Sequence, residues 1–292
     1  MDCDVLFGLF IRNGLNNTLN SQGRSPVLPP NPSKLEHPVS NSSTTNTTSS
    51  PVTIVTGASR GIGAAIAQRL AADGHAVVVN YAGSAREAQQ VVDTIVERGG
   101  RAIAIQANVA DAIAAKLLFD AATEAFGGVD VLVNNAGAMA NELPHLADTD
   151  DATFDRLFDI NVKGSFLAMR EAAKRLRHGG RIINFSTSVI GLGLPGYAVY
   201  AATKSAIETM TNILAKELRG KAITVNAVAP GPTATNLFLN GKTPEQVERL
   251  AKMAPLERLG QPEDIAAMVS VLAGPQGAWV NGQTVRVNGG IV

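Results

Sequence analysis

From Pro51 to the end of the chain, short runs rich in β-branched residues alternate with longer amphipathic stretches. Such alternation is typical of right-handed βαβ units, in which successive strands lie parallel and helices cover the sheet. The pattern predicts strands at 52–56, 76–80, 102–106, 131–134, 181–185, 224–228 and 284–287. It predicts helices near 61–73, 84–98, 111–126, 151–177, 199–219, 244–253 and 262–273. We therefore expect an α/β fold, a doubly wound, parallel seven-stranded sheet with helices on both faces, in a single domain over residues 52–292.

Residues 1–51 differ in kind from this domain. Every residue from Ser40 to Ser50 is Ser, Thr or Asn, and a proline-rich stretch precedes them. This composition cannot bury enough apolar surface to offset the entropy of ordering, so we expect a disordered N-terminal extension. The apolar run from Val5 to Ile11 is too short to span a bilayer and follows acidic residues, which is unlike a signal peptide.

Charge and cysteine content narrow the classes of function. The net charge is zero, so nothing favours nucleic acid or an anionic membrane as a partner. Cys3 is the only cysteine, which excludes an internal disulfide and a cysteine-based metal site, and the four histidines lack ligand spacing. We expect a cytoplasmic protein that uses no metal.

A glycine-rich turn joins the first predicted strand to the first predicted helix. Gly57, Gly61 and Gly63 lie between Thr56 and the helix, in the spacing GxxxGxG. Glycines at such a junction let the backbone approach a pyrophosphate, whose charge is met by the helix N-terminus. The turn therefore predicts a dinucleotide site.

The end of the second strand indicates which dinucleotide. NAD sites usually place an acidic residue there for the ribose hydroxyls, but this chain has Asn80 and Tyr81. Arg60, in the glycine turn, can pair with a 2′-phosphate, and Ser84 stands where the next helix begins. These residues favour NADP(H). Two alternatives stay open: Ser84 could form a capping box with Glu87, and Arg60 could be a solvated loop residue.

Tyr200 and Lys204 form the candidate catalytic pair. On a helix they lie one turn apart on the same face, which puts a phenol beside an ammonium. A nearby cation favours the phenolate, so we expect the pKa of Tyr200 to lie below its ordinary value of about 10.

The motifs together resemble the short-chain dehydrogenase/reductase family. They are the glycine turn, Asn134-Asn135-Ala136-Gly137, Asn161, Ser186-Thr187-Ser188, Tyr200-x-x-x-Lys204 and Pro230-Gly231. They occur in the family's order over residues 52–292, the whole predicted domain. The resemblance implies a Rossmann-type fold, and it is greatest to NADPH-dependent carbonyl and aldehyde reductases and 3-oxoacyl-carrier-protein reductases.

The resemblance also implies roles for four residues. Tyr200 would donate a proton to the carbonyl oxygen of the substrate, and Lys204 would lower the pKa of Tyr200 and hold the nicotinamide ribose. Ser188 would hydrogen-bond the same oxygen, and Asn161 would hold a water that links Lys204 to solvent. This is general acid catalysis with a hydroxyl donor and a hydride-carrying cofactor.

The position of the serine is open. The family's serine usually precedes the tyrosine by thirteen positions, and Thr187 occupies that position here. The local sequence Ser188-Val-Ile-Gly favours Ser188, with one residue deleted before Tyr200. Ser186 and Thr187 remain the competing hydroxyls.

The remaining cofactor contacts follow from the resemblance. Asn108 and Val109 would border the adenine, and Thr233 and Thr235 would meet the nicotinamide amide. The full set of expected cofactor residues is Gly57, Ser59, Arg60, Gly61, Ile62, Gly63, Asn80, Tyr81, Ser84, Asn108, Val109, Asn135, Ala136, Gly137, Tyr200, Lys204, Pro230, Gly231, Thr233 and Thr235. Residues 236–255 are expected to form a helical lid with a hinge at 240–242.

The sequence therefore predicts an NADPH-dependent reductase of a small-molecule aldehyde or ketone. The alternatives are an NAD(P)-linked alcohol dehydrogenase that works oxidatively and a non-catalytic dinucleotide sensor. The long apolar helices at 151–177 and 199–219, together with the habit of the family, indicate a homodimer or homotetramer.

Overall fold

The computed structural model of the chain describes residues 50–140 and 142–292, and the predictions made for residues 1–49 lie outside this part. Seven parallel strands form one sheet in the order β3-β2-β1-β4-β5-β6-β7. The strands are β1 (Val52–Val55), β2 (Ala76–Tyr81), β3 (Arg101–Gln106), β4 (Val131–Asn134), β5 (Arg181–Phe185), β6 (Thr224–Pro230) and β7 (Thr284–Val287). The predicted doubly wound α/β fold is confirmed, with strand bounds that differ from the prediction by at most two residues.

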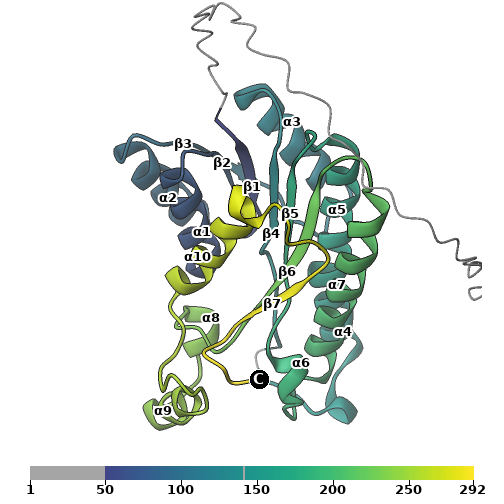
Figure 1. Cartoon of the computed structure of the whole chain (residues 1–292). Helices are drawn as coiled ribbons and strands as arrows, with labels where there is room; N and C mark the ends of the chain where they lie inside the picture. The colour runs from purple at the N-terminus through teal and green to yellow at the C-terminus, as the bar shows by residue number, and fades with distance from the viewer. Residues whose placement is uncertain (1–49, 141) are drawn as a thin grey trace, which may run out of the picture. The chain divides into compact units, whose positions relative to one another are not determined.

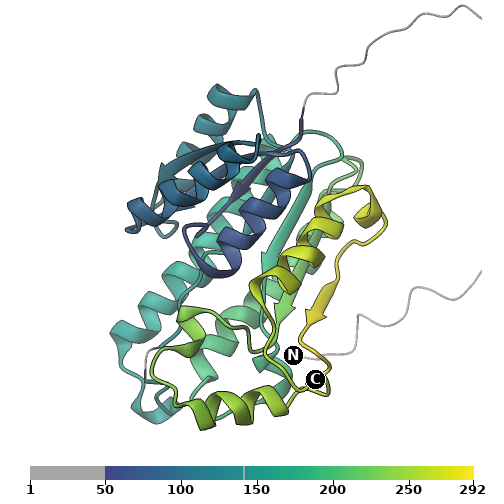
Figure 2. The ribbon, with the colours of Figure 1, turned by 90° about the vertical axis from the view of Figure 1, so that its left-hand side faces the viewer.

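Helices cover both faces of this sheet, as Figure 1 shows. On one face lie α1 (Gly61–Ala72), α2 (Ala85–Glu97) and α10 (Pro262–Ala273), the side turned toward the viewer in Figure 2. On the other face lie α3 (Ala114–Phe126), α5 (Gly164–Arg175) and α7 (Ala198–Glu217). No helix in the described ranges is long and apolar enough to cross a membrane.

The two faces of the sheet bury two separate cores. In β2, Val77 and Val79 pack against α1, α2 and α10, whereas Ala76 and Val78 pack toward α3 and α5. Successive side chains of a strand point to opposite faces, so strands that are buried on both sides need continuous apolar runs. This requirement explains why the β-branched runs located the strands so closely.

The predicted helix at 151–177 is divided. It consists of α4 (Asp151–Leu157), a π-helical turn labelled η2 (Phe158–Lys163) and α5. Asn161 lies in the π-helical turn, is fully buried, and bonds both the N–H and the C=O of Ala138. A π-helical turn admits an extra residue into a helix and often marks a functional site. Here it brings Asn161 against the loop that follows β4.

Short elements complete the fold. The predicted lid consists of α8 (Asn236–Leu239) and α9 (Pro244–Lys252), which lie together below the sheet in Figure 2. Thr243 and Gln246 form a capping box that begins α9. The sequence did not predict four short elements as separate units: η1 (Leu146–Asp148), α6 (Val189–Leu192), α8 and η3 (Pro275–Gly277).

Candidate active site

The strand order reverses between β1 and β4, and this position determines where a ligand can bind. The chain leaves β1 toward β2 and β3 on one side, whereas β4 to β7 continue on the other side. In an open α/β sheet the connections at such a switch point diverge and leave a crevice at the carboxyl ends of the strands. A cavity of about 680 Å³ lies there, lined by the turns after β1, β2, β4, β5 and β6.

The glycine turn after β1 is packed too tightly for other residues. Gly57 and Gly61 have φ of +62° and +56°. A Cβ at Gly63 would lie 2.4 Å from the carbonyl oxygen of Gly57 and 2.5 Å from Nδ2 of Asn135. Helix α1 then begins at Gly61, after the exposed Arg60, with its N-terminus at the cavity. The turn thus combines close backbone approach with the positive end of a helix, which fits a pyrophosphate.

Two asparagines hold this turn in place. Oδ1 of Asn80 accepts a hydrogen bond from the N–H of Gly57 at 3.2 Å, and its Nδ2 donates to the carbonyl of Ala107 at 2.9 Å. Nδ2 of Asn135 donates to the carbonyls of Thr56 and Gly57 at 2.9 and 3.0 Å. Asn80 borders the cavity, but its amide is engaged with the protein backbone, so it positions the turn as well as lining the site.

The end of β2 presents Tyr81 and Ser84 to the cavity, together with Arg60 from the glycine turn. Ser84 precedes α2 with φ −98° and ψ 66°, and its side chain makes no capping hydrogen bond. The capping box suggested by the sequence therefore does not form. A capping residue needs an extended backbone, which Ser84 lacks. Ser84 and Arg60 both line the cavity, so the lining offers a hydroxyl and a guanidinium to a phosphate on the adenosine ribose.

The other predicted cofactor residues converge on the same cavity. Thr235, from the segment after β6, packs over the glycine turn, because its Cγ2 lies 3.4 Å from where a Cβ of Gly61 would be. Val109 packs on Gly164 in a similar way. Every expected cofactor residue lines the cavity, and of the four expected catalytic residues only Asn161 does not.

Tyr200 and Lys204 lie on α7, one turn apart as predicted. The ammonium of Lys204 is 5.9 Å from the centroid of the Tyr200 ring and donates to the carbonyl of Phe185 at 2.9 Å. A Cβ at Gly137 would lie 3.4 Å from both Nζ of Lys204 and Oδ1 of Asn161, so these two side chains border the space beside Gly137. The glycine leaves space for a ligand to approach the lysine.

The pKa of Tyr200 differs from the sequence-based prediction. The pKa of Tyr200 is raised to about 12, mainly because burial disfavours the phenolate; the Thr187 hydroxyl lowers it and the nearby Tyr197 raises it. Burial also lowers the pKa of Lys204 to about 8. The prediction of a depressed tyrosine pKa is therefore wrong for the protein's own groups, because desolvation of the phenolate is the largest effect. The protonated phenol is the favoured form at neutral pH.

Asn161 is engaged entirely with the protein. Its Oδ1 accepts from the N–H of Ala138 at 2.7 Å, and its Nδ2 donates to the carbonyl of Ala138 at 2.9 Å and to Oγ1 of Thr203 at 3.1 Å. These bonds tie the loop after β4 to α7 beside Lys204. The water relay that the family resemblance implies for Asn161 stays a prediction.

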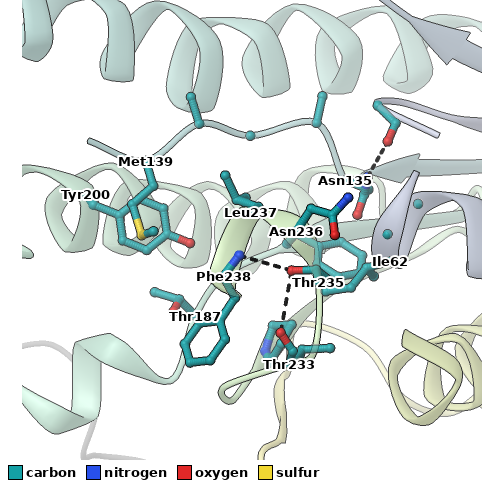
Figure 3. A pocket seen from close by; sticks show the side chains of 18 of the residues that line it. Ile62, Asn135, Met139, Thr187, Tyr200, Thr233, Thr235, Asn236, Leu237 and Phe238 are labelled. Carbon is teal, nitrogen blue, oxygen red and sulfur yellow. Dashed lines mark hydrogen bonds between the residues drawn. The ribbon is translucent and has the colours of Figure 1, made fainter. Parts of the chain in front are cut away.

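The three hydroxyls after β5 have different partners. The Ser188 hydroxyl donates to the carbonyl of Ala229 at 3.1 Å and accepts from Nδ2 of Asn288 at 2.9 Å. The Ser186 hydroxyl donates to the carboxylate of Glu208 at 2.5 Å. Thr187 lies close enough to Tyr200 to lower its pKa, and both side chains appear at the cavity in Figure 3. Thr187 therefore competes with Ser188 for the role of the second hydroxyl, and the choice of Ser188 stays a prediction.

The sequence did not single out several residues of the cavity. Met139 follows β4, Leu192 and Leu194 follow β5, Met253 follows α9, and Ile291 lies next to the C-terminus. Apolar residues in loops carry no periodic signal, so only the fold could assemble them.

Comparisons with known proteins agree with this geometry. The family model described as Enoyl-(Acyl carrier protein) reductase matches residues 57–292. A "Short-chain type dehydrogenase/reductase" of Picea abies is 49% identical over 249 residues, which cover 82% of this chain and 92% of the relative. An "NADPH-dependent aldehyde reductase-like protein, chloroplastic" of Arabidopsis thaliana is 48% identical, with 82% and 94% covered.

A solved structure is similar over the same region. The short chain dehydrogenase of Burkholderia cenocepacia, determined in complex with NADP, superposes with a TM-score of 0.77 at 40% identity. The match covers 82% of this chain and 97% of that one. Together with the tyrosine and lysine on α7 and the glycine turn after β1, these similarities show that the chain belongs to the short-chain dehydrogenase/reductase family.

Proposed function

We propose that this protein reduces an aldehyde or ketone with NADPH. The observation that carries the proposal is one cavity with two ends: a glycine turn with Arg60 at one end, and Tyr200 and Thr187 at the other. Relatives with this family's motifs carry the name NADPH-dependent aldehyde reductase, and a structural relative was solved with NADP. Both support the choice of cofactor.

NADP(H) fits the residues that line the cavity. The backbone at Gly57, Gly61 and Gly63 would receive the pyrophosphate, and Arg60 and Ser84 would bind the 2′-phosphate. Lys204 and the space above Gly137 would receive the nicotinamide ribose, and Thr233 and Thr235 lie where its amide would bind. Among the described residues that line the cavity, none is acidic, so nothing there would repel the 2′-phosphate.

When bound, NADPH would supply a hydride to the carbonyl carbon of the substrate. Tyr200 would donate its phenolic proton to the carbonyl oxygen, because its raised pKa keeps it protonated until the negative charge develops. Lys204, one turn along α7, would offer a positive charge to the phenolate that results.

We propose Thr187 as the second donor to the carbonyl oxygen. Its hydroxyl is close enough to Tyr200 to lower the pKa of the phenol, so an oxygen bound to both donors would sit where the charge develops. The hydroxyls of Ser188 and Ser186 bond Ala229 and Glu208. Serving the substrate would require either of them to break a buried hydrogen bond.

The names of similar proteins favour reduction over the oxidative alternative, since an NADPH-dependent aldehyde reductase-like protein is among them. Reduction uses the protonated phenol of Tyr200, which a pKa of about 12 favours at neutral pH. Oxidation would run the same proton transfer in reverse, with the phenolate as base. The alternative of a sensor that binds the dinucleotide without catalysis is one of the outcomes that the NADPH oxidation assay below can give.

Steady-state NADPH oxidation with a panel of aldehydes and ketones tests the function. Tyr200→Phe should lower kcat by about 100-fold or more, since a positioned general acid contributes about 10²–10⁴. Tyr197→Phe is the matched control, because Tyr197 lies at the same cavity but has no lysine one turn later. Binding of NADPH without turnover of any carbonyl would favour the sensor instead.

We also propose a homodimer or homotetramer that works in the cytoplasm. Large apolar side chains are exposed on the helices of one face, with Phe154 at 45%, Phe166 at 43% and Ile213 at 50%. Burying such side chains against a second copy would stabilise an assembly. Light scattering that gives a monomer at micromolar concentration would contradict the assembly, and a fluorescent fusion of the whole chain would test the location.

A further inference from the structure

The cavity continues beyond Tyr200 into a region that the cofactor contacts do not explain. We call it the substrate half and define it by Met139, Leu192, Leu194, Leu237, Phe238 and Met253, all of which line the cavity. These residues come from the loop after β4, the α6 segment, α8 and the end of α9. Figure 3 shows Met139, Leu237 and Phe238 beside Tyr200 and Thr187. The six side chains of the substrate half are apolar, and Tyr197, Asn236 and Asn240, which also line the cavity, carry no formal charge.

Charge is confined to the other half. Of the described residues that line the whole cavity, only Arg60 and Lys204 carry a formal charge. Arg60 lies at the start of α1, and the ammonium of Lys204 is buried and bonded to Phe185. Neither side chain can pair with a charge on the part of a substrate that lies in the substrate half unless it gives up its present position. The substrate half thus offers no partner for a carboxylate or a phosphate.

Lys242, four residues after Phe238, is a cation near this half in sequence, and it is engaged with the lid. Its Nζ donates to the carbonyl of Phe238 at 2.6 Å and lies 4.6 Å from the centroid of the Phe238 ring. Burial lowers the pKa of Lys242. The stem and the ammonium therefore fix both the last turn of α8 and the orientation of the Phe238 ring, by a hydrogen bond and a cation–π contact. Lys242 does not line the cavity.

We propose that the enzyme takes uncharged, apolar carbonyl compounds, with Phe238 as a specificity-determining wall that Lys242 positions. The inference rests on the proposed function and concerns the same site. A substrate with an anionic group near its carbonyl would have to place that charge against Met139, Leu237 and Phe238, where no lining residue in the described part of the chain offers a cationic partner.

The experiment compares 4-carboxybenzaldehyde with its methyl ester, which share the aromatic skeleton and differ in charge. We expect kcat/KM to be about 10- to 100-fold higher for the ester, the range for leaving one buried polar group unpaired. Leu237→Arg places a cation in the substrate half and should bring the two kcat/KM values closer together. Because the same two compounds are compared in wild type and variant, differences in their intrinsic reactivity cancel. An equal kcat/KM for both compounds with wild type, or an unchanged ratio in Leu237→Arg, would overturn the inference.

The role of the wall is tested with variants of α8 and its hinge. Phe238→Ala should raise KM for the ester with the Kd of NADPH unchanged, and Lys242→Met should do the same to a smaller extent. Trp279→Ala is the matched control, because Trp279 is 98% exposed and does not line the cavity. An unchanged KM in Phe238→Ala would refute its role, whereas a shift in Lys242→Met confined to kcat would refute a positioning role for Lys242.

The two levels of the proposal fail in different ways. If wild type binds NADPH but oxidises it with neither benzaldehyde nor any other neutral carbonyl, the proposed function itself is wrong. If it turns over both benzaldehydes equally, reduction stands and the inferred substrate class is wrong.

Discussion

Replacing Thr187 by Val tests the assignment of the second hydroxyl, where our proposal departs from the sequence-based choice of Ser188. Valine keeps the branched shape of threonine and has a methyl group in place of the hydroxyl, so packing in the buried loop is preserved. The change removes the hydroxyl that lowers the pKa of Tyr200 and the bond that Oγ1 accepts from the N–H of Val189 at 3.3 Å. Thr187→Ser restores a hydroxyl and provides the rescue control.

Two magnitudes separate the possible roles of Thr187. If its hydroxyl only orients Tyr200, losing one hydrogen bond costs about 0.5–1.5 kcal/mol, and the rate falls by about 2- to 12-fold. If it donates to the oxygen on which charge develops, its loss lowers kcat by about 100- to 1,000-fold, as for other donors in an oxyanion site. Because Thr187 also lowers the pKa of Tyr200, its loss makes Tyr200 a weaker acid and adds to the deficit. We therefore expect the larger effect.

Ser188→Ala is the decisive comparison. Ser188 is 2% exposed, and its hydroxyl bonds Ala229 and Asn288, so its removal should cost about 1–3 kcal/mol of folding stability. Its kcat should stay within about tenfold of wild type, because a change outside the reacting groups leaves the transition state intact. Initial rates of NADPH oxidation and urea unfolding provide both quantities. If Ser188→Ala loses catalysis while Thr187→Val retains it, the assignment to Thr187 is refuted.

Three further predictions follow from the same geometry. Arg60→Ala should weaken NADPH binding about tenfold or more while leaving NADH binding nearly unaffected, because one charge-assisted phosphate contact is lost. Equal losses of affinity for the two cofactors, measured by titration, would contradict this. Gly63→Ala should destabilise the fold by about 1–3 kcal/mol in urea, because its Cβ would meet Gly57 and Asn135, whereas Gly83→Ala, with nothing within 4 Å of its Cβ, should not. Burial lowers the pKa of Lys204 to about 8 from its ordinary 10.5. Between these two pH values the unfolded chain binds more protons than the folded chain, so the free energy of unfolding rises with pH. Wild type should therefore gain stability relative to Lys204→Met above pH 8, and a difference that stays constant with pH would count against a buried ammonium.

The sheet could be predicted closely because its physical requirements are local. Strands buried on both faces need continuous β-branched runs, and these runs start at the residues where β4, β5 and β7 start. The glycine turn was recognisable for a similar reason, since positive φ and close approach admit few residues other than glycine. The lid was located from its polar hinge, and α9 was predicted at 244–253, whereas α8 was not predicted as a separate helix.

What could not be predicted depends on tertiary contacts. The π-helical turn at Phe158–Lys163 has the same apolar periodicity as a continuous helix, and the contact of Asn161 with Ala138 that accompanies it joins distant segments. Ser84 has a suitable sequence for a capping box but an unsuitable backbone angle. The pKa of Tyr200 depends on how much water surrounds it, and the spacing of a tyrosine and a lysine carries no information about burial.

The choice among Ser186, Thr187 and Ser188 shows the same limit. The segment between them and Tyr200 contains a left-handed turn at Gly193, with φ 60°, and another at Gly196, with φ 82°. How these turns direct the loop decides which hydroxyl faces Tyr200. The local sequence Ser188-Val-Ile-Gly favoured Ser188, whereas the family's usual spacing of thirteen positions before the tyrosine favours Thr187, the residue that lowers the pKa of Tyr200.

The most direct test of the central claim follows the hydride and the proton donor together. Wild type and Tyr200→Phe are incubated with an aldehyde and NADPH that carries deuterium at both positions of the reactive nicotinamide carbon, and the alcohol product is analysed by mass spectrometry. We predict one deuterium per alcohol with wild type, and product formation slowed about 100-fold or more in Tyr200→Phe at an unchanged Kd for NADPH. Alcohol without deuterium, or labelled alcohol formed equally fast by the variant, would contradict the account.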